Sequence, residues 1–230
     1  MFQTEKILEL LNKSEIFQKD DFFTEEDAWG IYEAVKDDFS CKLCSGVSKA
    51  VLYFPDMDKV VKVPFNGSIA EIEKWDAQSD EYFYEWDAIQ FEYSPAMNSN
   101  WDYCLAEVDI YTDAESYGLG ECFAKTELIG QIHNHYPVYA QEKCSIFRYQ
   151  KREYSEEKRK SIKNYLSSTT RNSNTLSELW LSDFLEYFGK EVLDDFLDFL
   201  DERGINDLHN SNIGYIGDRP VLIDYCGWYD

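Results

Sequence analysis

Three polar side chains surround a short strand–turn–strand segment near the end of this 230-residue chain. Asp207 and Asn212 precede the run "IGYIG", and Asp224 directly follows the run "RPVLI". A hairpin of these two runs would bring Asn212 and Asp224 to the same end. Two oxygen ligands there suit Mg²⁺, which binds few protein side chains and completes its shell with substrate phosphates. Asp207 would lie near the attacking group, so the spacing indicates phosphoryl transfer.

The elements that must hold these side chains are predicted from the periodicity of the apolar residues. Residues 1–40 predict two helices, the second with Thr24 as N-cap and Asp27 three residues later, a weak capping box. The β-branched and aromatic runs "KAVLYF" at 49–54 and "KVVKVPF" at 59–65 predict a β-hairpin.

The rest of the chain predicts further helices and strands. Apolar spacing predicts a helix at 100–116, with Glu107 on a partly apolar face. A basic, Ser/Thr-rich stretch at 148–175 predicts a charged helix followed by a loop. Gly204 is expected to end the last helix. The remaining predicted elements are strands at 122–130 and 136–144 and helices at 176–188 and 190–204.

One acidic and aromatic segment, residues 66–97, is not assigned to a helix or a strand. Its many aromatic side chains predict packing rather than disorder, because such side chains bury large areas when they fold. The aromatic residues concerned are Trp75, Tyr82, Phe83, Tyr84, Trp86, Phe91 and Tyr93.

The net charge restricts the partners of the chain. With 45 acidic and 22 basic residues, the formal charge is −23, so the surface repels nucleic acid and anionic membranes. The acidic surface is either a solvated shell or an imitation of nucleic acid that occupies a partner's basic groove. No run reaches the ~18 apolar residues of a membrane span, and the N-terminus lacks the features of a secretory signal. We therefore expect a cytoplasmic protein.

Six cysteines without a secretory signal predict free thiols in a reducing compartment. "CKLC", at Cys41–Cys44, has the spacing of half a zinc site, and His133 and His135 offer nitrogen ligands. The other four cysteines form no second pair, so ordinary packing is the favoured interpretation.

The polar residues before the closing hairpin follow a pattern known from one superfamily. Asp207, Leu208, His209 and Asn212 form D-L-H-x-x-N, which resembles the catalytic loop of protein-kinase-like proteins. Aminoglycoside phosphotransferases and small phage-encoded kinase-like proteins carry this form of the loop. "DYCG" at 224–227 is similar to the metal-binding D-F-G element, and the resemblance extends over residues 41–230.

The resemblance implies a role for each residue of the set. Asp207 would be the catalytic base, and Asn212 and Asp224 would hold magnesium. "VVKV" resembles the V-A-I-K motif of the third strand, so Lys62 would contact the α- and β-phosphates of ATP. Glu107 on the following helix would pair with Lys62.

Two loops would complete the nucleotide site that the resemblance implies. "CSGVSK", which contains Gly46 and Ser48, stands where the phosphate loop is expected. "YAQEK" at 139–143, which contains Glu142, stands where the hinge would bind adenine through backbone groups.

The fold implied by the resemblance is α+β, of the protein-kinase-like two-lobe type, with an antiparallel sheet in the N-lobe and a reduced, mainly helical C-lobe. The expected domains are a helical extension at 1–40, an N-lobe at 41–144 with an insertion at 66–97, and a C-lobe at 145–230.

The chain departs from the family in three respects. The phosphate loop has one glycine, and "GIND" replaces the His-containing motif before the catalytic base. We also expect the chain to lack the peptide-binding helices that follow the D-F-G element in kinases.

Each residue of the set also has a structural interpretation. Asp207 and Asn212 can cap a turn, and Asp224 can cap the end of a strand. Lys62 can be a surface lysine on an edge strand, and Glu107 can reach water from the boundary of the core. The functional interpretation depends on all five residues occurring together in this order.

Two classes of function follow from these observations. The first is a minimal phosphotransferase that uses ATP and Mg²⁺ and acts on a host protein or on itself, with Ser167–Thr170 as self-acceptors. The second is an inactive or weakly active kinase-like protein, of phage origin, whose acidic surface inhibits a basic, nucleic-acid-binding host or defence protein. A small-molecule kinase shares the first mechanism, but we expect the usual helices of its substrate pocket to be absent, so this class ranks lower.

Overall fold

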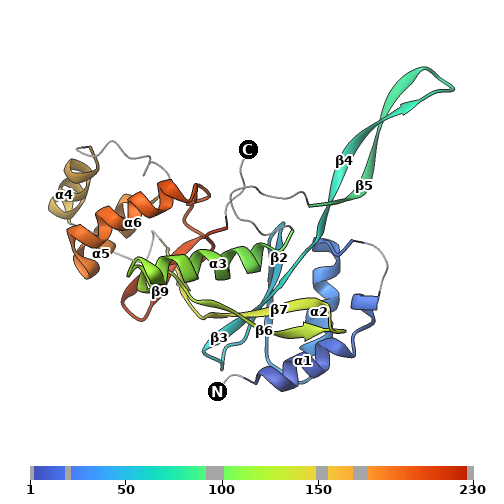
Figure 1. Ribbon diagram of the computed structural model, residues 1–230, viewed down its shortest axis with the longest axis horizontal. Coiled ribbons are helices and arrows are strands. Elements are labelled where there is room, and N and C mark those ends of the chain that lie inside the picture. The colour runs from blue at the N-terminus through green and yellow to red at the C-terminus, as the bar shows by residue number, and fades with distance from the viewer. Residues whose placement is uncertain (1–2, 19–21, 92–100, 149–154, 168–175, 227–230) are drawn as a thin grey trace. The chain divides into compact units, whose positions relative to one another are not determined.

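The computed structural model describes residues 3–18, 22–91, 101–148, 155–167 and 176–226. The fold is α+β, as predicted, with antiparallel strands and several helices (Figure 1). Contacts divide the chain into two compact units, residues 1–105 with 127–141 and residues 106–126 with 142–230. No helix in the described ranges is both long and apolar enough to cross a membrane.

A five-stranded sheet in the order β1-β2-β3-β7-β6 forms the centre of the first unit. The predicted hairpin is confirmed, since β2 pairs antiparallel with β3 from Lys49↔Pro64 to Tyr53↔Val60. β1 was not predicted as a strand, because it is short, polar and mostly exposed. The bounds are β1 Lys42–Ser45, β2 Lys49–Tyr53, β3 Lys59–Pro64, β6 Thr126–Ile132 and β7 Tyr136–Glu142.

The predicted N-terminal helices are also present. The capping-box partner is confirmed, because the Asp27 carboxylate accepts a hydrogen bond from the Thr24 backbone N–H at 2.8 Å. Burial of Ile7, Leu11 and Ile31 places one apolar face of each helix in the core. The helices are α1 Thr4–Asn12 and α2 Ala28–Val35, with single-turn helices at Glu15–Gln18 and Glu25–Asp27.

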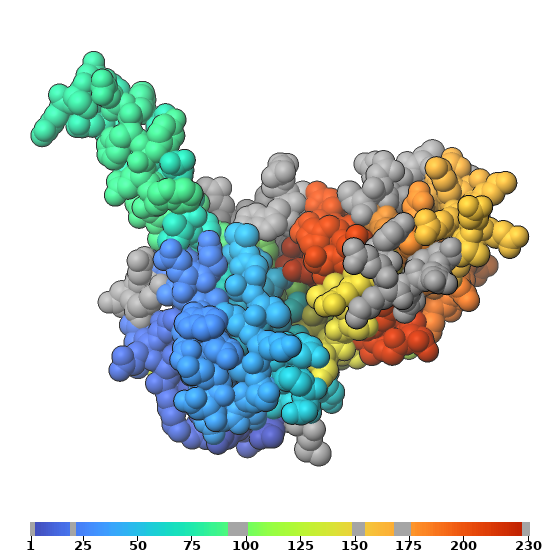
Figure 2. Space-filling model, turned by 180° about the vertical axis from the view of Figure 1, so that it is seen from behind, coloured from blue at the N-terminus to red at the C-terminus, as the bar shows by residue number. Residues whose placement is uncertain are grey.

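The acidic and aromatic segment forms a long two-stranded hairpin of β4 Gly67–Asp76 and β5 Glu81–Gln90. In Figures 1 and 2 it extends away from the rest of its unit. The predicted packing is wrong for the five aromatic residues of its strands, which are 44–65% exposed: Trp75, Tyr82, Phe83, Tyr84 and Trp86. Phe91 is buried as predicted, and Tyr93 lies outside the described residues.

Among its described residues, the second unit contains most of the α3 helix, three further α-helices and a three-stranded sheet in the order β10-β9-β8. The helix predicted within 148–175 is present, and the loop predicted after it lies outside the described residues. The strand predicted to start at 122 begins at Thr126, because residues 120–122 form a single-turn helix. The bounds are α3 Tyr103–Ser116, α4 Glu156–Ser167, α5 Glu178–Phe188, α6 Lys190–Glu202, β8 Ser145–Ile146, β9 Ile213–Ile216 and β10 Arg219–Leu222.

Aromatic side chains build the core of the second unit. The rings of Phe184 on α5 and Phe196 on α6 stack at 4.6 Å, and Trp180 and Phe123 contact Phe196. Gly204 ends α6 as predicted. Its φ of +62° is a left-handed conformation that glycine adopts without a steric penalty.

No disulfide joins the six cysteines, all of which lie in the described ranges, as the sequence predicts. Their environments differ, as Cys122 and Cys44 illustrate. Cys122 is buried, which raises the pKa of its thiol to about 12, whereas Cys44 is exposed. At pH 8 the Cys122 thiol is therefore protonated, and only the thiolate is an effective nucleophile.

We expect iodoacetamide at pH 8 to modify Cys44 at least a hundredfold faster than Cys122 in the folded chain. Mass spectrometry of peptides after timed pulses measures both rates, and the two should become similar in denaturant. Equal rates in the folded chain would contradict the burial of Cys122.

Candidate functional site

The closing hairpin joins two of the predicted residues through the backbone. The Asn212 carbonyl accepts hydrogen bonds from the N–H groups of Ile223 at 2.7 Å and Asp224 at 3.4 Å. β9 and β10 pair antiparallel from Leu222↔Ile213 to Arg219↔Ile216, and Gly217 makes the tight turn with a φ of +62°. Asn212 and Asp224 therefore lie at the same end of the hairpin, as the sequence predicts.

Asp207 joins this group through the Asn212 side chain. The Asn212 amide nitrogen donates to the Asp207 backbone carbonyl at 2.7 Å and to its carboxylate at 3.2 Å. Asn212 is buried, which fixes its amide in this arrangement. The Asp207 side chain is 41% exposed, with His209 Nε2 at 3.5 Å from its Oδ1. Its carboxylate is thus held from one side and accessible to solvent from the other.

A second cluster joins Glu107 to Asp224 through Cys226. Glu107 is fully buried on α3, so the interpretation of a boundary residue that reaches water is wrong. Its carboxylate accepts a hydrogen bond from the Thr126 hydroxyl at 2.7 Å and lies 3.8 Å from Cys226 Sγ. Cys226 Sγ also lies 3.6 Å from Asp224 Oδ1.

Ligand atoms of Glu107, Asp224 and Cys226 all lie within 4.8 Å of one another. Within the described ranges this is the one group of three residues with metal-ligating atoms so close together. Neither Cys41 and Cys44 nor His133 and His135 belong to it, so the described residues offer no zinc site at those positions.

Asn212 and Asp224 offer oxygen donors, which suit a hard cation. Asp224 offers a carboxylate, and the amide nitrogen of Asn212 is used by Asp207, which leaves the amide oxygen as the donor to a cation. Oxygen donors of this kind suit Mg²⁺, whereas the Cys226 thiol suits softer metals. Asn212 and Asp224 therefore match the chemistry of the ion that the sequence predicts.

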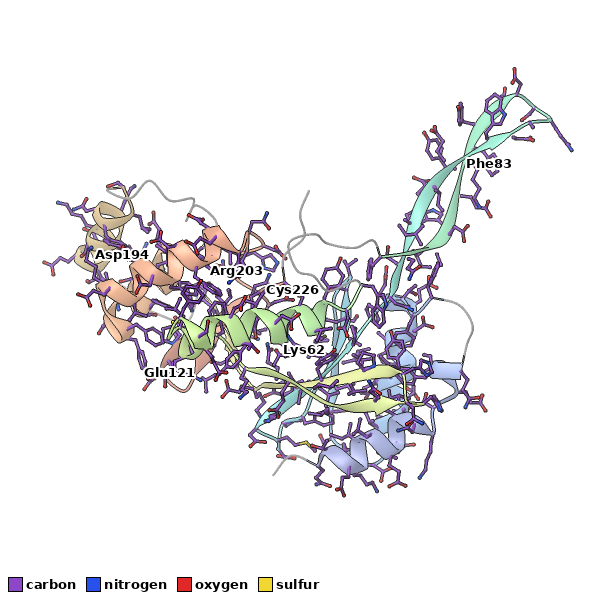
Figure 3. All side chains as sticks on the ribbon, viewed as in Figure 1. Lys62, Phe83, Glu121, Asp194, Arg203 and Cys226 are labelled. Atoms are coloured by element: carbon purple, nitrogen blue, oxygen red, sulfur yellow. The ribbon has the colours of Figure 1, made fainter. Side chains whose placement is uncertain are left out.

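Of the other predicted residues, Lys62, Gly46 and Ser48 belong to the first unit and Glu142 to the second. Lys62, labelled in Figure 3, lies on β3. This strand lies between β2 and β7, and the register partner of Lys62 on β2 is Val51. Lys62 is only 3% exposed, so the interpretation of a surface lysine on an edge strand is wrong. The predicted pairing of Lys62 with Glu107 joins residues of different units and stays a prediction.

The predicted phosphate loop is the turn between β1 and β2. Gly46 is exposed and its N–H donates to the Lys49 carbonyl at 3.0 Å, while the Ser48 carbonyl accepts from Phe65 N–H at 2.8 Å. A Cβ atom at Gly46 would meet nothing within 4 Å, so this loop has open space beside it.

The predicted hinge residue Glu142 lies at the end of β7. Its backbone N–H donates to the Lys125 carbonyl at 3.1 Å, and its carboxylate accepts from the Lys125 N–H at 3.0 Å. Arg219 lies 3.6 Å from the same carboxylate. The Glu142 carbonyl accepts a hydrogen bond from Cys144 Sγ at 3.2 Å, so its backbone and its carboxylate both have protein partners. Its role toward adenine stays a prediction.

Thr126 and Cys226 are the residues of this region that the sequence analysis missed. Cys226 could have been noticed, because it lies inside the DYCG motif two residues after Asp224. Thr126 carries no motif at all, and only the tertiary structure brings its hydroxyl to Glu107.

Comparison of the chain with models of protein families, with curated proteins and with solved structures finds no match in any of the three.

Proposed function

We propose that this chain is a minimal phosphotransferase of the protein-kinase-like type, which transfers the γ-phosphoryl group of ATP to a protein hydroxyl with Mg²⁺. The observation that carries the proposal is the arrangement at the closing hairpin. Asn212 hydrogen-bonds to Asp224 through its backbone and to Asp207 through its side chain. Phosphoryl transfer needs a base and a metal-binding carboxylate held together in this way.

In this proposal Asp207 orients the acceptor hydroxyl. The acceptor oxygen bonds to the γ-phosphorus, the bond from that phosphorus to the bridging oxygen of ADP breaks, and Asp207 accepts the hydroxyl proton. The partial exposure of the Asp207 carboxylate supports this role, because an acceptor must reach it from solvent. The Asn212 amide donates one hydrogen bond to this carboxylate and one to the Asp207 backbone carbonyl, and the two together would keep the side chain in one orientation.

Asn212 and Asp224 would hold the metal ion, which would neutralise charge on the phosphate oxygens when bound. Cys226 supports this assignment as a neighbour of Asp224, since a thiol within 3.6 Å of a carboxylate oxygen can orient it by a weak hydrogen bond.

The first unit supports nucleotide binding through Lys62. A lysine buried on an inner strand is rare without a functional or structural partner, and kinases place their phosphate-binding lysine on the third strand of the N-lobe. By the resemblance, Gly46 and Ser48 would approach the phosphates, and Lys62 would pair with Glu107. The two-lobe kinase-like fold is part of the same proposal.

Calorimetric titration of the full chain with ATP tests the proposal, with Mg²⁺ in one series and excess EDTA in the other. We expect binding that depends on Mg²⁺, together with transfer of ³²P from labelled ATP to the chain itself or to histone as a protein acceptor. No heat of binding at millimolar ATP would contradict the nucleotide site.

Asp207→Asn separates binding from chemistry. It keeps the size of the side chain but removes the base, so we expect ATP affinity within about threefold of native and a transfer rate at least a hundredfold lower. Equal transfer by the native chain and by this variant would contradict the role of Asp207.

A further inference from the structure

The hairpin of β4 and β5 presents two different faces. Residues directly opposite each other in an antiparallel pair point to the same face, and the register pairs Glu71 with Trp86, Glu73 with Tyr84 and Trp75 with Tyr82. We call these six residues the aromatic face. The other face carries Lys74, which register pairs with Phe83.

The aromatic face combines exposed rings with carboxylates. Its four rings are about half to two thirds exposed, and Trp75 and Tyr82 contact each other with ring centroids 4.8 Å apart. The Tyr84 hydroxyl donates to the Glu73 carboxylate at 2.9 Å, which holds this pair in place. Exposed rings that gather on one face in this way are typical of an interaction site.

The positive charge of the hairpin lies on the opposite face and is already neutralised there. Lys74 is the one basic residue among residues 67–90, and its Nζ lies 3.0 Å from both Glu85 and Asp87. Seven carboxylates in the same range leave a net charge of −6. The aromatic face therefore offers rings and negative charge without a competing cation.

We propose that the aromatic face binds an arginine-rich segment of another protein. A guanidinium group is planar, stacks on tryptophan and tyrosine rings and pairs with carboxylates, so it matches both components of the face. A second copy of the chain would bring the same carboxylates against each other, and nucleic acid would meet the same repulsion. The proposal is independent of the phosphotransferase activity, because none of its residues belongs to the site proposed for ATP.

Fluorescence anisotropy with a labelled peptide tests this inference on the full chain. The probe is a twelve-residue peptide of alternating arginine and glycine, compared with versions in which lysine or citrulline replaces arginine. We expect the arginine peptide to bind most tightly and the uncharged citrulline peptide to bind at least tenfold more weakly. Failure of the arginine peptide to bind at low salt would overturn the proposal.

Two double variants separate the aromatic face from general attraction to an acidic chain. Trp75→Ala with Trp86→Ala should weaken binding of the arginine peptide at least tenfold. Trp29→Ala with Tyr187→Ala removes two aromatic side chains of similar exposure outside the hairpin and should change affinity less than twofold. Equal affinity of both double variants and the native chain would show that net charge alone attracts the peptide, and would overturn the proposal.

A charge variant and a spectroscopic signal complete the test. Glu71→Gln with Glu73→Gln keeps every ring and should also weaken binding, with a smaller dependence on salt. In nuclear magnetic resonance spectra, the indole N–H signals of Trp75 and Trp86 should shift when peptide is added, whereas the signal of the buried Trp180 should not. Sedimentation that reveals a dimer lost in Trp75→Ala with Trp86→Ala would instead assign the face to a second copy.

Asp224→Ala distinguishes this inference from the proposed function. It lies outside the hairpin and should leave binding of the arginine peptide unchanged. Loss of peptide binding in this variant would mean that the peptide occupies the region of the closing hairpin, and would overturn the assignment to the aromatic face.

Discussion

Replacing Asp224 with alanine is expected to abolish Mg²⁺-dependent binding of ATP and to lower the transfer rate by about a thousandfold or more. In the proposed site Asp224 supplies the negative charge that holds the metal, and Asn212 supplies only a neutral oxygen. Without Asp224, the phosphates would lose the cation that compensates their charge. Titration calorimetry with and without EDTA measures the first effect, and transfer from labelled ATP measures the second.

Asp218→Ala is the matched control for this substitution. This substitution makes the same change of charge and volume as Asp224→Ala. It lies in the exposed turn between β9 and β10, at the other end of the same hairpin. We expect its ATP affinity and transfer rate to stay within about twofold of native. Equal losses in the two variants would mean that only the net charge or the stability of the hairpin matters.

Asp224→Asn gives an intermediate test of the same idea. It keeps an oxygen ligand and removes the charge, so ATP should bind more weakly than to the native chain and more tightly than to Asp224→Ala. A variant with asparagine that binds ATP as tightly as the native chain would argue against a metal-binding carboxylate at this position.

The closing hairpin was predictable because its determinants are local. Two apolar runs of strand length flank a Gly-Asp turn, and this pattern sets both the pairing and the end at which Asn212 and Asp224 meet. The same reasoning predicted β2 and β3, whose β-branched residues and connecting turn are adjacent in sequence.

The long hairpin of β4 and β5 was not predictable in the same way. Both of its faces carry charged and aromatic side chains, so the alternation of apolar and polar residues that indicates a half-buried strand is missing. Exposed aromatic residues such as Trp86 also contradict the usual expectation that large rings are buried. Such local conflicts are expected where a surface serves an interaction rather than the core.

The surroundings of Glu107 depend on tertiary structure. Helical spacing placed this carboxylate on a partly apolar face but left open whether it was buried or reached water. Contacts with Thr126 and Cys226, which are 19 and 119 residues away in sequence, settle its burial. No local pattern in one sequence encodes partners at such separations.

Trp180→Ala is expected to destabilise the second unit by about 3–5 kcal/mol, the usual cost of removing a large buried aromatic side chain. Trp180 is fully buried on α5, and its indole N–H donates to the Gly214 carbonyl on β9 at 3.1 Å. Truncation leaves both a cavity and a carbonyl without this donor. Trp29→Ala is the control, because that ring is 60% exposed, and should change stability by less than about 0.5 kcal/mol.

The loss of stability in Trp180→Ala should extend to the candidate site. Trp180 donates its hydrogen bond to Gly214 on β9, and Asn212 directly precedes this strand. Unfolding of each unit can be followed in urea by pulse alkylation of its own buried cysteine, Cys104 in the first and Cys122 in the second. We expect the Cys122 transition to move to lower urea and the Cys104 transition to move less. If Trp180→Ala left the Cys122 transition where it is in the native chain, the indole would not support β9, and weaker ATP binding in that variant would need another cause.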